Sequence, residues 1–134
     1  MTLFQSLYAM MLAVILGGML TFQLLFAPLL FSKLELPTAR AFIRAFFPWY
    51  YLYFAALTAV ALLLRYSAQF YGDAWVLLGC LLGFLLSGAI LMPAANAASD
   101  AGDRRRFSWV HRLSVAINTV QLGAFVLLGF WFIH

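Results

Sequence analysis

The chain has 134 residues, of which eight are Lys or Arg and four are Asp or Glu, so its net charge is +4. Hydrophobic residues make up 66% of the sequence, whereas about 45–50% is usual in soluble domains. A soluble domain of this composition would lack the polar residues needed to cover its surface. Intrinsic disorder and a nucleic-acid-binding module are also excluded, as is a disulfide scaffold, because Cys80 is the single cysteine.

The charged residues are confined to three short stretches, 33–44, 65–73 and 100–112. Four charge-free runs remain, and they cover residues 1–32, 45–64, 74–99 and 113–134. A helix needs about 20 residues to cross a hydrocarbon core of roughly 30 Å. The sequence therefore predicts an all-α membrane protein, in which residues 1–134 form one up-down bundle of four transmembrane helices.

The first span is expected over about Leu7 to Leu30. It lacks the basic n-region of a signal peptide, so we predict that it is retained as a helix. One face of this helix carries Met10, Gly17, Thr21 and Pro28. We expect this face to pack against other helices, because small residues allow backbones to approach closely and Pro28 removes a backbone donor.

A short helix over Leu36 to Phe47 is predicted to lie at the membrane interface between the first two spans. Arg40 and Arg44 are one helical turn apart there, beside apolar residues that suit an interfacial helix. Pro48 is expected to end or bend this helix. The second span then follows to about Leu64, and the aromatic residues at its start are typical of a membrane interface.

The third span is predicted over about Ala74 to Met92 and is expected to end at Pro93. It carries Gly79, Gly83 and Ser87 at four-residue intervals. This small-xxx-small ridge indicates helix packing and is common in membrane helices.

The fourth span is predicted from Arg104 to about His134, with Asp103 as its N-cap. Four hydrogen-bonding side chains lie on it within an arc of about 80°, and these are His111, Ser114, Asn118 and Gln121. An unsatisfied polar group in hydrocarbon costs several kcal/mol, so this polar stripe must face the bundle or a water-filled cavity. One interpretation is a polar pocket open to the cytoplasm, with Asn96 and Asp100 near its mouth. The other is a set of interhelical hydrogen bonds worth about 0.6 kcal/mol each.

His111 is the titratable group of the polar stripe. It is interpreted either as a proton relay or axial haem ligand, or as an interfacial histidine bonded to a carbonyl or to Asp100. We expect no metal site, because His111 and His134 would be about 34 Å apart on one helix and neither lies near Cys80. No Ser/His/Asp constellation or phosphate-binding glycine loop is present. No cofactor is predicted, and haem is the alternative.

The basic residues predict the orientation of the chain. Seven of the eight Lys and Arg lie in the 33–44 and 100–112 loops, and Arg65 is the eighth. The positive-inside rule places these two loops in the cytoplasm and both termini outside, in the cytoplasmic (inner) membrane. The run Arg104, Arg105 and Arg106 is interpreted as a site for anionic lipid headgroups, or simply as a determinant of topology.

Two blocks of the sequence resemble the transmembrane protein 205-like family of unknown function. The first block comprises Phe26 to Phe31 and Ala39 to Tyr51. The second comprises Leu91 to Asn96, Asp100, Val110 to Val115 and Asn118. This resemblance implies a four-span membrane protein and no established activity. A more distant similarity is to the haem-binding membrane protoporphyrinogen oxidase and the copper-resistance D proteins. Those proteins are expected to carry a histidine in the first span, and residues 1–32 contain none.

The leading hypothesis is a non-enzymatic membrane protein that binds or helps to move a small molecule through the polar pocket, or that acts as an assembly partner. One alternative is a haem- or quinone-dependent membrane oxidoreductase that uses His111, and another is a purely structural subunit. The expected partners are the lipid bilayer and either a second copy of the chain or another membrane protein, without nucleic acid. Ion coupling at the midplane is disfavoured, because every charged residue lies at an interface.

Overall fold

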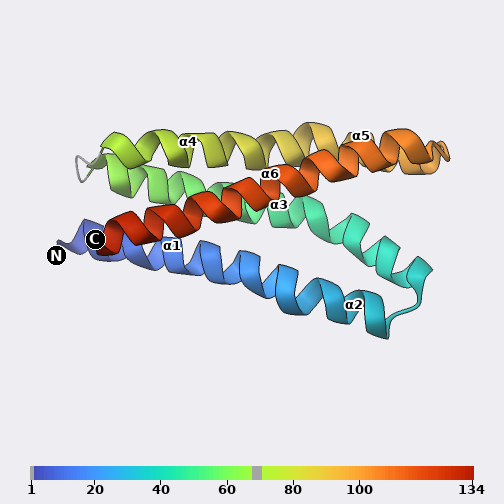
Figure 1. The fold of residues 1–134 in the computed structure, drawn as a ribbon, viewed down its shortest axis with the longest axis horizontal. Helices are drawn as coiled ribbons and strands as arrows, with labels where there is room; N and C mark the ends of the chain where they lie inside the picture. The colour runs from blue at the N-terminus through green and yellow to red at the C-terminus, as the bar shows by residue number, and fades with distance from the viewer. Residues whose placement is uncertain (1, 68–70) are drawn as a thin grey trace.

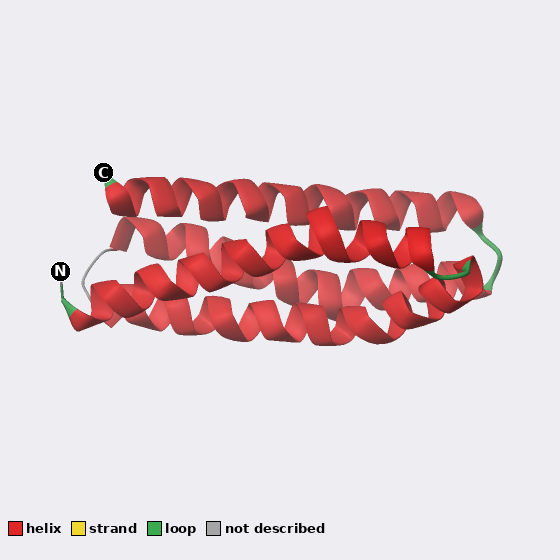
Figure 2. Ribbon diagram, turned by 90° about the horizontal axis from the view of Figure 1, so that it is seen from below, coloured by secondary structure: helices red, strands yellow, loops and turns green. Residues whose placement is uncertain are grey.

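The computed structural model describes residues 2–67 and 71–134, and among these residues it contains helices and no strand (Figures 1 and 2). The elements are α1 (Leu3–Thr21), the π-helical turn η1 (Phe22–Phe26), α2 (Ala27–Lys33), α3 (Leu36–Ser67), α4 (Tyr71–Leu86), the π-helical turn η2 (Ser87–Leu91), α5 (Met92–Asp100) and α6 (Arg104–Ile133). They form four rods, each long and apolar enough to cross a membrane. The prediction of an all-α, four-helix membrane protein is confirmed.

The rods run up and down, so that both termini lie at one end of the bundle (Figure 1). We call this the terminal end, and we call the opposite end, where α2 meets α3 and α5 meets α6, the basic end. Seven of the eight Lys and Arg lie toward the basic end. Around the bundle, α1 packs against α3 and α6, and α4 also packs against α3 and α6.

Large apolar side chains fill the axis of the bundle. Ile15, Met19, Phe84, Phe125 and Leu128 are fully buried and come from α1, α4 and α6. Equally large side chains cover the outside: every rod carries exposed leucines together with exposed valines or tryptophans. A fold that is apolar both inside and outside is suited to lipid rather than to water.

A π-helical turn precedes a proline in two of the rods. In these turns the amide of Ala27 donates to the carbonyl of Phe22, and the amide of Met92 donates to that of Ser87. The next residue in each rod is a proline, which has no amide hydrogen and clashes with the carbonyl four residues earlier. The wider turn relieves that clash and lets the helix continue. The prediction that Pro93 ends the third span is therefore wrong, since this rod continues to Asp100.

The segment predicted as a short interfacial helix, Leu36 to Phe47, is helical but is not separate from the second span. This segment forms the first turns of α3, which runs without interruption to Ser67 and contains Pro48. Stacked rings explain why it stays with the bundle: the ring centroids of Phe22 and Phe46 are 5.4 Å apart, and those of Phe26 and Phe46 are 5.2 Å apart. These contacts hold the start of α3 alongside η1 and α2.

The predicted packing face of the first helix points out of the bundle. Met10, Gly17, Thr21 and Pro28 are all exposed, and a Cβ atom added at Gly17 would have no neighbour within 4 Å. The buried face carries Tyr8, Leu12, Ile15 and Met19 instead. Bulky side chains occupy the space between α1 and its neighbours, so the expectation that the small residues mark this contact is wrong within the single chain.

A buried ion pair closes the terminal end. Arg65 on α3 and Asp73 on α4 are both 8% exposed, and their Nη2 and Oδ2 atoms are 2.6 Å apart. The Arg65 guanidinium also lies 4.8 Å from the centroid of the Tyr8 ring. This cluster connects α1, α3 and α4 where the hydrophobic core ends.

Candidate functional site

The polar stripe lies on α6, which begins where the sequence predicted. Gly102 has a φ of 70°, which allows the tight turn after α5. Asp103 then caps the new helix, because its Oδ1 accepts a hydrogen bond of 3.1 Å from the amide of Arg106. The helix runs from Arg104 to Ile133 and presents the stripe along one side.

The deepest member of the stripe, Gln121, bonds to a neighbouring helix. Its side chain is 4% exposed, and Nε2 donates to the carbonyl of Cys80 on α4 at 2.8 Å. The bond requires glycine at position 83, because a Cβ atom there would lie 2.6 Å from Nε2. Oε1 of Gln121 is buried and has no hydrogen-bond partner among the described residues.

Asn118, one turn nearer the basic end, reaches across the bundle to α3. The Tyr50 hydroxyl donates to Oδ1 of Asn118 at 3.2 Å. Tyr50 is buried within an aromatic cluster, and its ring centroid lies 5.0 Å from that of Phe22 and 4.6 Å from that of Phe54. At Asn118 the polar stripe therefore faces an aromatic wall formed by rings of η1 and α3.

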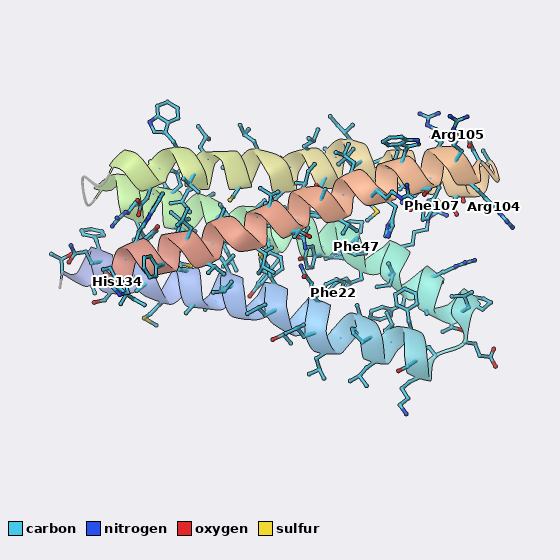
Figure 3. All side chains as sticks on the ribbon, in the orientation of Figure 1. Phe22, Phe47, Arg104, Arg105, Phe107 and His134 are labelled. Atoms are coloured by element: carbon cyan, nitrogen blue, oxygen red, sulfur yellow. The ribbon has the colours of Figure 1, made fainter. Side chains whose placement is uncertain are left out.

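The part of the stripe nearest the basic end makes local contacts. Ser114 is half-buried, and its hydroxyl donates to the carbonyl of Val110 on the same helix at 3.0 Å. His111 is exposed and stacks on Phe107, one turn earlier, with centroids 5.7 Å apart. Phe107 lies toward Arg104 and Arg105, while His134 lies at the far end of the same helix (Figure 3).

The two residues expected at the mouth of the pocket lie on α5. Asn96 is half-buried, on a helix that packs against α6. Asp100 is exposed and forms a two-pronged ion pair with Arg44 on α3, with both N–O distances at 2.7 Å. The Asp100 carboxylate therefore binds Arg44, whereas one interpretation of the sequence paired it with His111.

The structure thus divides the predicted pocket residues into two groups. Asn118 and Gln121 form bonds between helices, whereas His111 and Ser114 contact their own helix. Sequence reasoning missed Tyr50 and the other rings of the wall. The sequence does contain a pattern that indicates these rings, because aromatic residues recur there at four-residue intervals and so share one face of a helix. They are Phe22 and Phe26 in the first rod, and Phe42, Phe46 and Tyr50 in the second.

The remaining candidates are distributed over both ends of the bundle. Gly83 and Ser87 lie in helix contacts, whereas Gly79 faces open space. Arg104, Arg105 and Arg106 are all exposed at the basic end, where a lipid headgroup site stays a prediction. Within residues 2–67 and 71–134 no group of three His, Cys, Asp or Glu side chains is arranged to hold a metal ion.

Comparison with known families places the chain. Residues 10–104 match the family described as a domain of unknown function, DUF4149, which is well over half of the chain. The chain belongs to this family. The DUF4149 match runs from within α1 to the first residue of α6, so the whole polar stripe lies beyond it. No match is found among curated proteins or among solved structures. The DUF4149 chain is therefore a small multi-pass membrane protein of unestablished activity.

Proposed function

We propose that this protein binds a small anionic amphipathic molecule in the half of the bundle nearest the basic end. His111, Ser114 and Asn118 would contact its polar group, and the aromatic wall around Phe22 and Tyr50 would contact its apolar part. This ligand-binding role agrees with the four apolar helices of the chain and involves no catalysis.

The observation that carries the proposal is the change along the polar stripe. Gln121 and Asn118, deep in the bundle, each bond to a neighbouring helix. His111, two turns nearer the basic end than Asn118, is exposed although it lies on the same side of α6. The amide oxygen of Asn118 and the side chain of Gln121 are used to hold helices together. We infer that the amide nitrogen of Asn118, and His111 toward the basic end, are left for a ligand.

The charge around this end favours an anion. Seven basic residues lie toward it, against Glu35, Asp100 and Asp103, and Asp100 is already paired with Arg44. A basic surface raises the local concentration of anions and speeds their association. A histidine and an asparagine can then donate hydrogen bonds to a carboxylate or phosphate.

The same charge distribution supports an orientation. We infer that the basic end faces the cytoplasm and that both termini lie outside the inner membrane, following the positive-inside rule. The two sequence blocks also support a relation to the transmembrane protein 205-like proteins. A ligand would then enter the bundle from the cytoplasmic leaflet.

Fluorescence titration with dansylaminoundecanoic acid tests the proposal on the protein in nanodiscs. The parent protein should bind this acid more tightly than its uncharged methyl ester. His111→Ala should weaken binding of the acid about tenfold, equivalent to about 1.4 kcal/mol for one charge-assisted hydrogen bond. His134→Ala is the matched control, because His134 also stacks on a phenylalanine one turn earlier, at the other end of α6.

Two results would contradict the proposal. The first is equal binding of the acid and the ester by the parent protein. The second is a loss of binding when Arg104, Arg105 and Arg106 are replaced by Gln, with no effect of His111→Ala. That result would assign the binding to lipid-like contacts on the surface, outside the polar stripe.

A further inference from the structure

An ion pair connects the two sides of the basic end between which the ligand is proposed to bind. The Arg44 guanidinium donates two hydrogen bonds of 2.7 Å to the Asp100 carboxylate. Arg44 lies near the start of α3, the helix that supplies rings of the aromatic wall. Asp100 ends α5, which packs against α6 and its polar stripe. The pair therefore joins the wall to the side of the stripe.

Arg44 lies at about the same depth in the bundle as His111. The hydrogen bond between Tyr50 and Asn118 marks a common level on α3 and α6. Arg44 precedes Tyr50 by six residues, and His111 precedes Asn118 by seven. At the rise of an α-helix, these separations place Arg44 about 9 Å and His111 about 10 Å nearer the basic end than that bond. A fixed positive charge therefore lies at the level of the exposed end of the stripe.

The ion pair can exchange its carboxylate. The side chains of Arg44 and Asp100 are 49% and 59% exposed, so water already solvates both charges and the pair contributes little to stability. The Arg65–Asp73 pair at the terminal end differs, because both its residues are 8% exposed. A planar guanidinium binds any carboxylate or phosphate with the same two parallel hydrogen bonds. A ligand oxyanion can therefore take the position of the Asp100 carboxylate.

We infer that Arg44 holds the acidic group of the ligand, and that Asp100 occupies Arg44 when no ligand is bound. This inference rests on the proposed function and deepens it, because it assigns the ligand an acidic group with two free oxygen atoms. Binding breaks the two Arg44–Asp100 hydrogen bonds and forms two between Arg44 and the ligand. Asp100 thus competes with the ligand, and it lowers the apparent affinity by the fraction of molecules in which it holds Arg44.

Titration of nanodisc-embedded variants with dansylaminoundecanoic acid tests the inference. Asp100→Asn should bind the acid about threefold more tightly than the parent, because it releases Arg44 from a weak exposed pair. Arg44→Gln should bind it about fivefold more weakly, because the two hydrogen bonds are lost. Arg44→Lys keeps the charge without the planar fork and should restore the affinity only in part. In an Arg44→Gln background, Asp100→Asn should bring no gain, because no guanidinium is left to release.

Two charge-matched variants provide the controls. Asp103→Asn removes the same charge three residues after Asp100, at an exposed position where asparagine still caps α6. Arg40→Gln removes the same charge as Arg44→Gln, one turn earlier on α3, where Arg40 is exposed and forms no ion pair among the described residues. Each control should change the affinity by less than about twofold, because salt screens single exposed charges.

Two results would overturn the inference. Equal gains in Asp100→Asn and Asp103→Asn would mean that net charge alone sets the affinity. A gain from Asp100→Asn that persists in the Arg44→Gln background would mean that Asp100 does not act through Arg44.

Failure of the proposed function would look different. In that case the parent protein would bind the acid and its methyl ester equally, and both proposals would be wrong. Weaker binding in His111→Ala together with unchanged binding in Arg44→Gln would overturn this inference alone. All the substituted side chains are exposed, and an unchanged Tm in detergent confirms that each variant is folded.

Discussion

Short and long polar side chains behave differently within these spans. The hydroxyls of Thr58, Ser114 and Thr119 each donate to the carbonyl four residues earlier on their own helix. Such local bonds satisfy the hydroxyl and connect nothing else. Asn118 and Gln121 have longer side chains and bond to other helices. Among these residues, the serine and threonine side chains therefore bond within one helix, whereas the asparagine and glutamine side chains bond between helices.

Gly83→Ala tests whether the Gln121 bond contributes to stability. The new methyl group would meet Nε2 of Gln121 at 2.6 Å and displace it from the carbonyl of Cys80. We expect a loss of about 1 kcal/mol in the free energy of unfolding, in the range of interhelical hydrogen bonds in membranes. Thermal unfolding in detergent measures it as a lowered Tm.

Gly79→Ala is the control for this prediction, because its methyl group meets nothing and should leave the Tm unchanged. A double variant separates the causes. In a Gln121→Ala background the side chain that the new methyl group would meet is absent. Gly83→Ala should therefore lower the free energy of unfolding less there than in the parent protein. Equal costs in the two backgrounds would show that the effect of Gly83→Ala does not act through Gln121.

The helices themselves illustrate what the sequence could and could not predict. The charge-free runs predicted all four rods, because few charges are tolerated in hydrocarbon. Pro48 was expected to end or bend a helix and Pro93 to end one, because proline interrupts helices in water. In a bundle the rods continue through both prolines, and at Pro93 a π-helical turn absorbs the strain. Residue spacing along α1 also failed to predict its buried face. Tyr8 is buried and Gly17 is exposed because of the helices that pack beside them, and spacing within one helix does not contain that information.

Asp73→Asn tests the buried ion pair that joins α3 and α4 at the terminal end. The substitution removes the carboxylate that lies 2.6 Å from Arg65 and leaves a guanidinium that is mostly shielded from water. Breaking a buried pair in this way costs about 3–5 kcal/mol. Chemical unfolding in detergent should show a loss of this size.

The pair also predicts a rescue. Arg65→Gln combined with Asp73→Asn removes both charges and should be more stable than Asp73→Asn alone. Asp103→Asn is the matched control, because Asp103 is exposed at the start of α6 and asparagine caps helices equally well. A similar loss in Asp103→Asn and Asp73→Asn would mean that burial of the ion pair is not the cause.

The whole molecule shows why the polar stripe was predictable and its partners were not. Four polar residues on one side of a helix follow from spacing alone. Their partners lie far along the chain: Tyr50 is 68 residues from Asn118, and Cys80 is 41 residues from Gln121. The Arg44–Asp100 pair spans 56 residues. Such pairings arise when rods pack, and no local pattern specifies them.

The orientation of the bundle is the last prediction, and it rests on the whole charge distribution. Arg105→Cys at the basic end and Gly72→Cys near the terminal end are both at exposed positions. Each is introduced into a Cys80→Ala background, which removes the native buried thiol. Arg105→Cys still leaves six basic residues toward the basic end against Arg65 at the other, so the positive-inside bias is retained. In right-side-out membrane vesicles, an impermeant maleimide should label Gly72→Cys directly and Arg105→Cys only after the membrane is opened. The reverse pattern would invert the topology, and labelling of both before opening would mean that the chain inserts in both directions.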